Sequence, residues 1–559
     1  ESHGYATDTK KEEEFNHGPS LTQAAAPRSI QPQQQCPSPV PKDQQAWAKA
    51  NRHINEKDLR SRFERFVAPP EQRKPLPILQ RGLSLQFFRD LHETLEIDHH
   101  FSFLEVLWLV QILTLMADLS LAEMMGDKKD ANGQPYRAAS NRFVSHATAH
   151  TSFEDLAALE AYGAKSVGDG GTLFCFSDVC AINQSRVMDD DELPQLEALI
   201  KACQRTVLIF NKWHDPEVVK RIWCLYEIQK TAQHQCQMEV CFSAAQHESF
   251  LLALKNKHPK GLKSTTVLDS LSRIDAAKAE ATQEADRKRI FAEIEGSIAG
   301  GIAALDDQVK ELLRKELVRV MRAAVEESGE DEDAARLAFG VGNVFWQALG
   351  QYDDALAMYT RAREIDERLG NDNNAAVSLG MMGAVYRMQG KKELAVETLQ
   401  QALALMEGLY GKDHIALAAV LNNLGTALGK CGKDAKALAV QQRCLRIYEA
   451  KYGEGSAETA MTVGNIANTH RMIRNLDLAL EMAQKALRIK ESHGVGHIQT
   501  AAAISTIAGV MYKQGDYPAA LDMAEQCLRI RRAAYGANSN HPEIAKTTRL
   551  VNKIRAKME

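Results

Sequence analysis

The sequence lacks a long hydrophobic run, a charge excess of one sign and a CxxC pair of cysteines. Its most apolar segment, residues 106–117, is twelve residues long. A membrane-spanning helix needs about 20 apolar residues, so we predict a buried helix there and no membrane span. The net charge of −5 gives no general attraction for nucleic acid. Ten cysteines without a CxxC pair suit reduced thiols and favour an intracellular location.

The length of 559 residues predicts several domains, because one hydrophobic core rarely grows beyond about 250–300 residues. Residues 1–45 are charged and then rich in Pro, Gln and Ser, which predicts a disordered arm. Residues 46–139 predict a helical subdomain ending in a linker around Asn132-Gly133. We expect a cytoplasmic or cytoskeleton-associated protein. The chain begins with Glu1, so a removed organelle-targeting segment stays open.

Residues 140–245 alternate between short apolar stretches and amphipathic ones. They predict strands at 142–145, 172–178, 206–210 and 238–242, and helices at 153–167, at 193–203 and from Pro216 onward. Strands separated by helices form a parallel sheet covered on both faces, so we predict an α/β domain. Ligands bind such sheets beyond the carboxyl ends of the strands, which here carry Ser145, Asp178 and residues 211–213.

Trp223 and Glu227 form the most distinctive pair in this region. They are four residues apart on the predicted third helix and so share one face. An indole beside a carboxylate at the end of a buried strand suits a ligand pocket. The same spacing suits a tryptophan packed in the core and a glutamate paired near the helix start. Both interpretations stay open.

Two segments of this region carry distinctive motifs: residues 223–227 read WCLYE, and residues 178–184 read DVCAINQ. The first resembles the WxxxE motif of the Toll/interleukin-1 receptor (TIR) superfamily, and the second resembles the DxxCINQ segment of its heterokaryon-incompatibility branch, with the cysteine one place early. The resemblance implies a flavodoxin-like sheet. The resemblance implies that Glu227 is the catalytic carboxylate of an NAD glycohydrolase, with Trp223 and Asp178 beside it. NAD would be the substrate, and no resident cofactor is expected. An adaptor without catalysis is the alternative, and the acidic run 189–192 would repel pyrophosphate.

The remaining sequence predicts a helical connector at 246–330, broken at Gly300-Gly301, and then repeats over 331–559. An alanine recurs at spacings of 40, 42, 42 and 41, at Ala355, Ala395, Ala437, Ala479 and Ala520. Small residues also recur twelve before and seven after it, which lets two antiparallel helices approach closely, as in tetratricopeptide repeats. We predict an α-solenoid of five helix pairs with a capping helix at 543–557. Asn343 and Arg474 depart from the pattern, so the first and fourth repeats are expected to pack less regularly.

The long linkers and LxIxE-like second helices of the repeats resemble those of kinesin light chains. This resemblance implies a scaffold whose first helices line a groove for a partner. Asn can bond a peptide backbone, and Arg and Lys can pair with acidic side chains, so the predicted partner is an acidic protein or peptide. The candidate contact residues are Arg387, Asn422, Asn423, Lys430, Asn465, Asn468, Arg471 and Lys513. The alternative is a simple solvated face.

No metal site is predicted, because cysteines are more often core residues than ligands and the pairs here are five residues apart: Cys175 and Cys180, Cys236 and Cys241. Three functions follow. The first is an intracellular interaction scaffold that couples the repeats to a TIR-like domain. The second is an NAD glycohydrolase with Glu227 catalytic. The third is an architectural subunit of a large assembly. A homo-oligomer formed through the TIR-like domain stays open.

Overall fold

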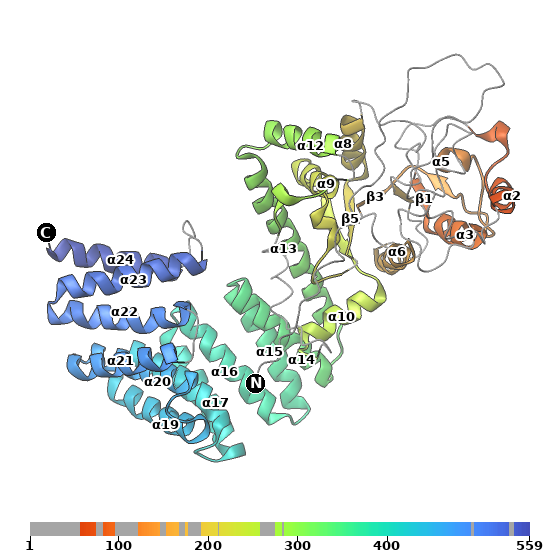
Figure 1. Cartoon of the computed structure of the whole chain (residues 1–559). Helices are drawn as coiled ribbons and strands as arrows, with labels where there is room; N and C mark the ends of the chain where they lie inside the picture. The colour runs from red at the N-terminus through yellow and green to blue at the C-terminus, as the bar shows by residue number, and fades with distance from the viewer. Residues whose placement is uncertain are drawn as a thin grey trace, which may run out of the picture. The chain divides into compact units, whose positions relative to one another are not determined.

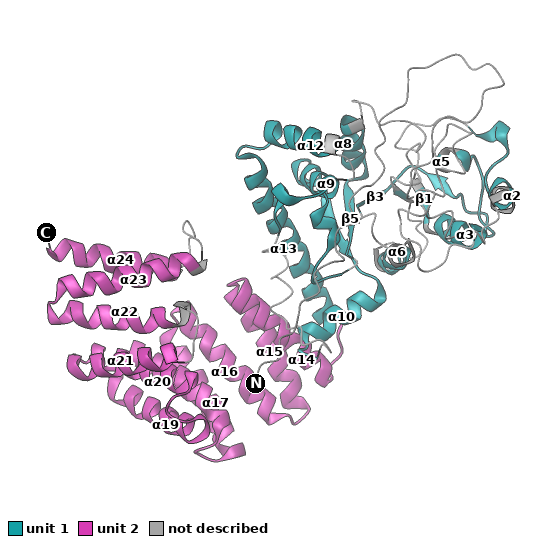
Figure 2. Cartoon of the chain, in the orientation of Figure 1, with its two compact units in different colours: residues 1–326 teal, residues 327–559 magenta. Residues whose placement is uncertain are grey.

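The structure is a computed structural model. It describes residues 56–73, 82–95, 121–145, 152–166, 174–176, 192–210, 212–257, 274–281, 284–492, 497–535 and 542–558. The predicted arm at 1–45 and the predicted helix at 106–117 lie outside these ranges. The chain divides into two compact units, residues 1–326 and 327–559 (Figure 2). None of the described helices is both long enough and apolar enough to cross a membrane.

Unit 1 holds a six-stranded sheet and the helices around it (Figure 1). Its strands are β1 (Gly82–Ser84), β2 (Arg137–Ala138), β3 (Arg142–Ser145), β4 (Phe174–Phe176), β5 (Arg205–Ile209) and β6 (Gln237–Cys241). Its described helices are α2 (Glu56–Phe66), α3 (Leu85–Leu95), α5 (Leu121–Met124), α6 (Ser152–Ser166), α8 (Glu192–Cys203), α9 (Ile222–Gln233), α10 (Ala244–Leu254), α12 (Glu284–Ser297) and α13 (Gly301–Glu327).

The prediction of a parallel sheet with helices on both faces is confirmed. Strands β4, β3, β5 and β6 lie in that order and pair in parallel. Numbered along the chain, this is the order 2-1-3-4, with which flavodoxin-like sheets begin. Helices α8 and α9 contact one face and α6 the other. Side chains alternate accordingly: Phe143 packs with α8, while its neighbour Val144 belongs to the core on the α6 side.

Residues 46–139 do not form the separate helical subdomain that we expected. Strands β1 and β2 come from this segment and extend the sheet, with β1 antiparallel to β4. Phe63 and Phe87, on α2 and α3, share one buried core with Val207 of β5. The sequence concealed this because β1 and β2 are three and two residues long, too short for an alternating pattern.

Helix α9 begins later than predicted. Pro216 precedes a single 3-10 turn, Glu217–Lys220, and the α-helix starts only at Ile222. The predicted connector does contain two helices, α12 and α13, which are separated at Gly300-Gly301. Both of these glycines have positive φ. The second of them, α13, provides Glu316, whose Oε1 accepts a bond of 2.9 Å from the backbone N–H of Val240. Strand β6 is the last strand of the sheet, so this carboxylate satisfies a backbone donor at the sheet edge.

Unit 2 is the predicted solenoid of five helix pairs followed by a capping helix. The first helices of the pairs, here the A helices, are α14 (Glu332–Asn343), α16 (Asp372–Gln389), α18 (Ala418–Lys430), α20 (Ala457–Met472) and α22 (His497–Gln514). The second, or B, helices are α15 (Tyr352–Arg368), α17 (Lys392–Tyr410), α19 (Asp434–Tyr452), α21 (Leu476–Ser492) and α23 (Tyr517–Tyr535). The capping helix is α24 (Pro542–Met558), and each helix packs on the next along the chain (Figure 1).

The recurring small residues are where the two helices of a pair meet. A Cβ on Gly383 would lie 2.5 Å from Cγ of Leu399, and one on Gly425 would lie 2.5 Å from Cγ of Gln441. In the fourth and fifth pairs the facing residues are two alanines, Ala467 with Ala483 and Ala508 with Ala524, all buried. Only a residue without a large side chain fits at these contacts.

The turns between A and B helices share one backbone conformation. The residue five places before each recurring alanine has positive φ: Gly350, Gly390, Gly432, Arg474 and Gly515. In the second to fifth repeats the next residue donates its N–H to the carbonyl five residues earlier, in the last turn of helix A, as in a Schellman motif. The fourth repeat therefore keeps the same turn although Arg474, with φ 63°, replaces the glycine. The expected irregularity there is confined to one strained residue.

Candidate functional site

The A helices from α16 onward form one continuous face of the repeat unit together with the capping helix. Helix α16 contacts α18, α18 contacts α20, α20 contacts α22 and α22 contacts α24. We call this surface the A-helix face. All eight sequence-predicted contact residues lie on α16, α18, α20 or α22. The structure thus places them on neighbouring helices of one layer, in two groups.

The first group is four asparagines in the middle of α18 and α20. Nδ2 of Asn465 donates a hydrogen bond of 2.7 Å to Oδ1 of Asn422, which joins the two helices. Asn422, Asn423 and Asn465 are half-buried, and Asn468 is exposed and accepts from Arg471 at 2.7 Å. An amide carries two donors and an acceptor, so this pairing leaves Nδ2 of Asn422 and Oδ1 of Asn465 able to bond a peptide backbone.

The second group is four cations in the last turn of the A helices. Arg387 is half-buried, and within the described part of the chain its Nε has no hydrogen-bond partner. The stem of Arg471 lies over Gly509, where a Cβ would stand 3.3 Å from Cδ of Arg471. Lys513 donates to the backbone oxygen of Arg471 at 2.8 Å. Lys430 is exposed.

Burial lowers the pKa of all four cations below the usual value. The pKa of Lys430 is lowered further by neighbouring positive charges, with Arg387 the strongest. Lys513 is affected in the same way by Arg471, Arg474 and Lys553. Arg387 therefore lies near Lys430, and Arg471 lies near Lys513. An anionic ligand would relieve the repulsion between these positive charges.

Further cations, not among the predicted contact residues, lie at the turns. Lys391, Lys392, Lys433 and Lys436 are exposed and follow a positive-φ glycine, and Arg474, also exposed, is itself the positive-φ residue of the fourth turn. The signal was present in the sequence, since each lies within six residues of the recurring glycine or its Arg474 equivalent. Only their placement at one end of the helix pairs shows that they belong together.

The α/β unit places Trp223 and Glu227 one turn apart on α9, both half-buried. Helix α12 packs on α9 here. The Arg289 guanidinium lies 5.8 Å from the centre of the Trp223 ring. Nζ of Lys230, one turn beyond Glu227, pairs with Glu293 at 3.0 Å. The face of α9 that carries Trp223 and Lys230 is therefore in contact with α12, a helix of the predicted connector.

The third residue of the predicted catalytic group, Asp178, lies outside the described residues. Ser145 at the end of β3 is buried, and its Oγ has no hydrogen-bond partner among the residues that the structure describes. The catalytic role of Glu227, Trp223 and Asp178 stays a prediction.

A tetratricopeptide repeat family model matches residues 333–408, 393–450, 416–492 and 458–533. The C-terminal region thus carries tetratricopeptide repeats, as predicted. Residues 1–332 lie outside these matches. No curated protein matches the chain.

Similar solved structures are repeat proteins of low identity. BtubC (BKLC) from P. vanneervenii is 19% identical, with 40% of this chain and 90% of that chain covered and a TM-score of 0.33. The nearly identical TPR-like repeats of a kinesin light chain of Podosopora anserina are 17% identical, covering 37% and 100%, with a TM-score of 0.31. YrrB, a TPR protein with an unusual peptide-binding site, is 19% identical, covering 42% and 99%, with a TM-score of 0.25.

Proposed function

We propose that this chain is an interaction scaffold whose A-helix face binds an extended, acidic segment of a protein partner. Tetratricopeptide repeats support a protein or peptide partner in general. The observation that carries the proposal is the Asn422–Asn465 bond, which fixes two amides side by side on adjacent helices with hydrogen-bonding capacity to spare. The cations at the ends of the same helices supply charge for acidic side chains.

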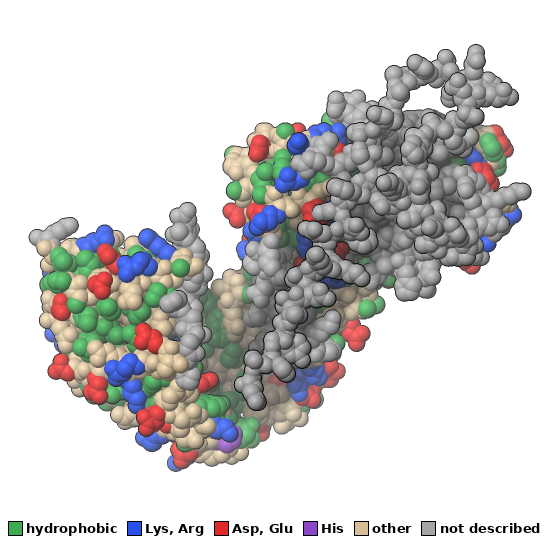
Figure 3. Space-filling view, viewed as in Figure 1, with side chains coloured by type: hydrophobic (Ala, Val, Ile, Leu, Met, Phe, Trp, Pro, Cys, Tyr) green, Lys and Arg blue, Asp and Glu red, His purple; other side chains and the backbone are tan. Residues whose placement is uncertain are grey.

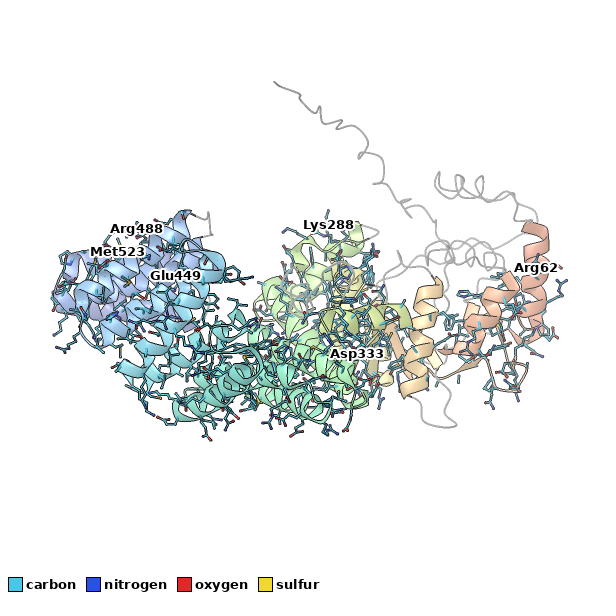
Figure 4. All side chains as sticks on the ribbon, turned by 90° about the horizontal axis from the view of Figure 1, so that it is seen from below. Arg62, Lys288, Asp333, Glu449, Arg488 and Met523 are labelled. Carbon is cyan, nitrogen blue, oxygen red and sulfur yellow. The ribbon has the colours of Figure 1, made fainter. Side chains whose placement is uncertain are left out.

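A peptide array graded in net charge from basic to acidic tests this function on the full chain. We expect acidic peptides to bind and basic ones not to bind. Asn422→Ala with Asn465→Ala should weaken binding to every bound peptide at least tenfold, because backbone contacts do not depend on side-chain sequence. Arg387→Glu should selectively weaken the binding of acidic peptides. Arg488→Glu, an exposed residue on helix α21 (Figure 4), is the matched charge control. Equal binding across the charge series would contradict the proposal.

We also propose that unit 1 is TIR-like and works as the coupled module of this scaffold. The support is the parallel strand order 2-1-3-4 together with the WCLYE helix. If unit 1 is TIR-like, the second candidate function is an NAD glycohydrolase. Glu227 would be its catalytic residue, assisted by Trp223 and Asp178, and NAD would be the substrate. The alternatives without catalysis are an adaptor, a homo-oligomer formed through this unit, and an architectural subunit of a large assembly.

Nicotinamide release from NAD separates these readings. The purified chain is assayed at dilute and at high concentration, because self-association could complete a site. Release that disappears in Glu227→Gln and persists in Glu295→Gln, an exposed glutamate of α12, would support catalysis. No release at any concentration would leave the adaptor function. The reduced thiols expected from the sequence support an intracellular place, either cytoplasmic or cytoskeleton-associated.

A further inference from the structure

Cations, most of them exposed, gather where the A helices of the second to fifth repeats turn into B helices, whereas the first turn, residues 346–354, has none. We define the turn edge as the segments 386–394, 428–436, 470–478 and 511–519. They hold nine basic and four acidic residues. The basic residues are Arg387, Lys391, Lys392, Lys430, Lys433, Lys436, Arg471, Arg474 and Lys513.

The opposite end of the same helices has the reverse charge balance. In the second and third repeats the turn-edge segments 386–394 and 428–436 carry six basic and two acidic residues. The loops at the other end, 407–415 and 449–457, carry two basic and four acidic residues, among them Glu449 (Figure 4). The repeats are therefore polarised along their helix axes.

The turn-edge cations are not neutralised within the unit. Among the described residues, none of the nine forms an ion pair. Elsewhere in the repeats such pairs are common: Arg443 binds Glu407, and Lys485 lies 3.6 Å from Glu454. The acidic residues of the turn edge lie at the starts of the B helices, where the helix dipole stabilises them.

Large aliphatic side chains are exposed among these cations. Met388, Leu394, Met472 and Ile473 keep 48%, 40%, 50% and 42% of their surface in solvent. Met388 and Met472 occupy the repeat position that Lys430 and Lys513 occupy in the alternate repeats. Apolar and cationic side chains thus alternate along one edge. Figure 3 shows lysine and arginine side chains close to hydrophobic ones on the visible side of the repeats.

We propose that the turn edge docks on an anionic lipid membrane, with the lysines and arginines against the headgroups and the aliphatic side chains in the interface. Each basic residue near an anionic bilayer strengthens binding electrostatically, and buried aliphatic groups add to this. Nucleic acid fits less well, because single strands are held by aromatic stacking and the exposed side chains here are methionine, leucine and isoleucine. This inference does not rest on the peptide-binding function.

Vesicle flotation of the full chain tests the proposal. We expect the protein to float with phosphatidylcholine vesicles that contain phosphatidylserine, to stay behind with phosphatidylcholine alone, and to lose binding as salt rises. The fourfold variant Lys391→Glu, Lys392→Glu, Lys433→Glu and Lys436→Glu should bind at least tenfold more weakly. These lysines are exposed and lie outside the predicted peptide set, so peptide binding should persist in this variant. Lys412→Glu with Lys451→Glu, exposed at the opposite end, is the charge control.

The apolar contribution is tested without changing charge. Met388→Ser with Met472→Ser should weaken vesicle binding several-fold, whereas Met461→Ser, also exposed but at the start of α20, should not. Helicity measured by circular dichroism checks that each variant folds. Three results would each overturn the proposal. They are equal flotation with neutral vesicles, unchanged vesicle binding by both the fourfold lysine variant and the Met388→Ser with Met472→Ser variant, and salt-dependent binding of single-stranded RNA without binding of vesicles.

Discussion

Gly342 lies directly against the ring of Tyr359, and a Cβ at this glycine would stand 2.8 Å from Cε1 of the tyrosine. This contact corresponds to Gly383 with Leu399 in the second repeat. Gly342 is thirteen residues before Ala355, however, and Gly383 is twelve before its alanine. A π-helical turn, Val344–Ala348, takes up the additional residue. The irregularity that we predicted from Asn343 is thus a one-residue insertion, and Oδ1 of Asn343 accepts from the Tyr359 hydroxyl at 2.8 Å.

Gly342→Ala should destabilise unit 2 by about 1–3 kcal/mol, because the ring of Tyr359 is fully buried and cannot move aside. Urea unfolding followed by circular dichroism measures the change. Gly408→Ala is the control: this helical glycine has no atom near an added Cβ, so alanine should leave stability equal or raise it by up to about 1 kcal/mol. If both substitutions had the same effect, the close contact would not limit stability.

Arg474→Gly should stabilise the fourth repeat by about 0.5–1 kcal/mol. A non-glycine residue pays about 1–2 kcal/mol for the left-handed conformation, which glycine adopts freely at a smaller entropic cost. Gly432→Ala, at φ 71° in the third repeat, is the reciprocal change and should destabilise. The midpoint of urea unfolding checks both. A lower midpoint for Arg474→Gly would show that contacts of the arginine outweigh its strain.

Stability of the repeats should fall on acidification because of His470. His470 is 9% exposed, its Nδ1 has no hydrogen-bond partner among the described residues, and burial lowers its pKa below the usual 6.5. The unfolded chain therefore binds a proton more readily than the folded one, and stability is lost as pH falls through about 6.5. His470→Gln should flatten the dependence of the urea midpoint on pH between about 7 and 5. An unchanged slope would assign the dependence to other groups.

Lys230 should hold α12 against α8 and α9. Its Nζ is buried, with 2% of the side chain exposed, and lies 2.9 Å from Glu197 of α8 and 3.0 Å from Glu293 of α12. Lys230→Met removes the cation that these two partly exposed carboxylates share and should cost about 1–3 kcal/mol. Adding Glu197→Gln and Glu293→Gln should recover most of this loss. Thermal unfolding measures the series, and no recovery in the triple variant would show that packing, not charge, is lost.

The sheet illustrates how far pattern reasoning reaches. Residues 206–210 form a continuous apolar run, and the buried strand β5 was predicted within one residue at each end. The predicted strand at 238–242 likewise corresponds to β6. Strands β1 and β2 were missed, because their conformation depends on pairing with β4 and with each other and not on an alternating pattern.

The candidate sites divide in the same way. Local patterns were enough to predict the five repeats, the capping helix and the inner-helix asparagines and cations, because a repeat of about 42 residues leaves its period in the positions of small residues. Three relationships depend on long-range packing: Asn422 bonds Asn465, α12 packs on the face of α9 that carries Trp223, and cations from four separate turns lie at one edge. Those relationships join residues far apart in the chain, and no local pattern encodes a distance between them.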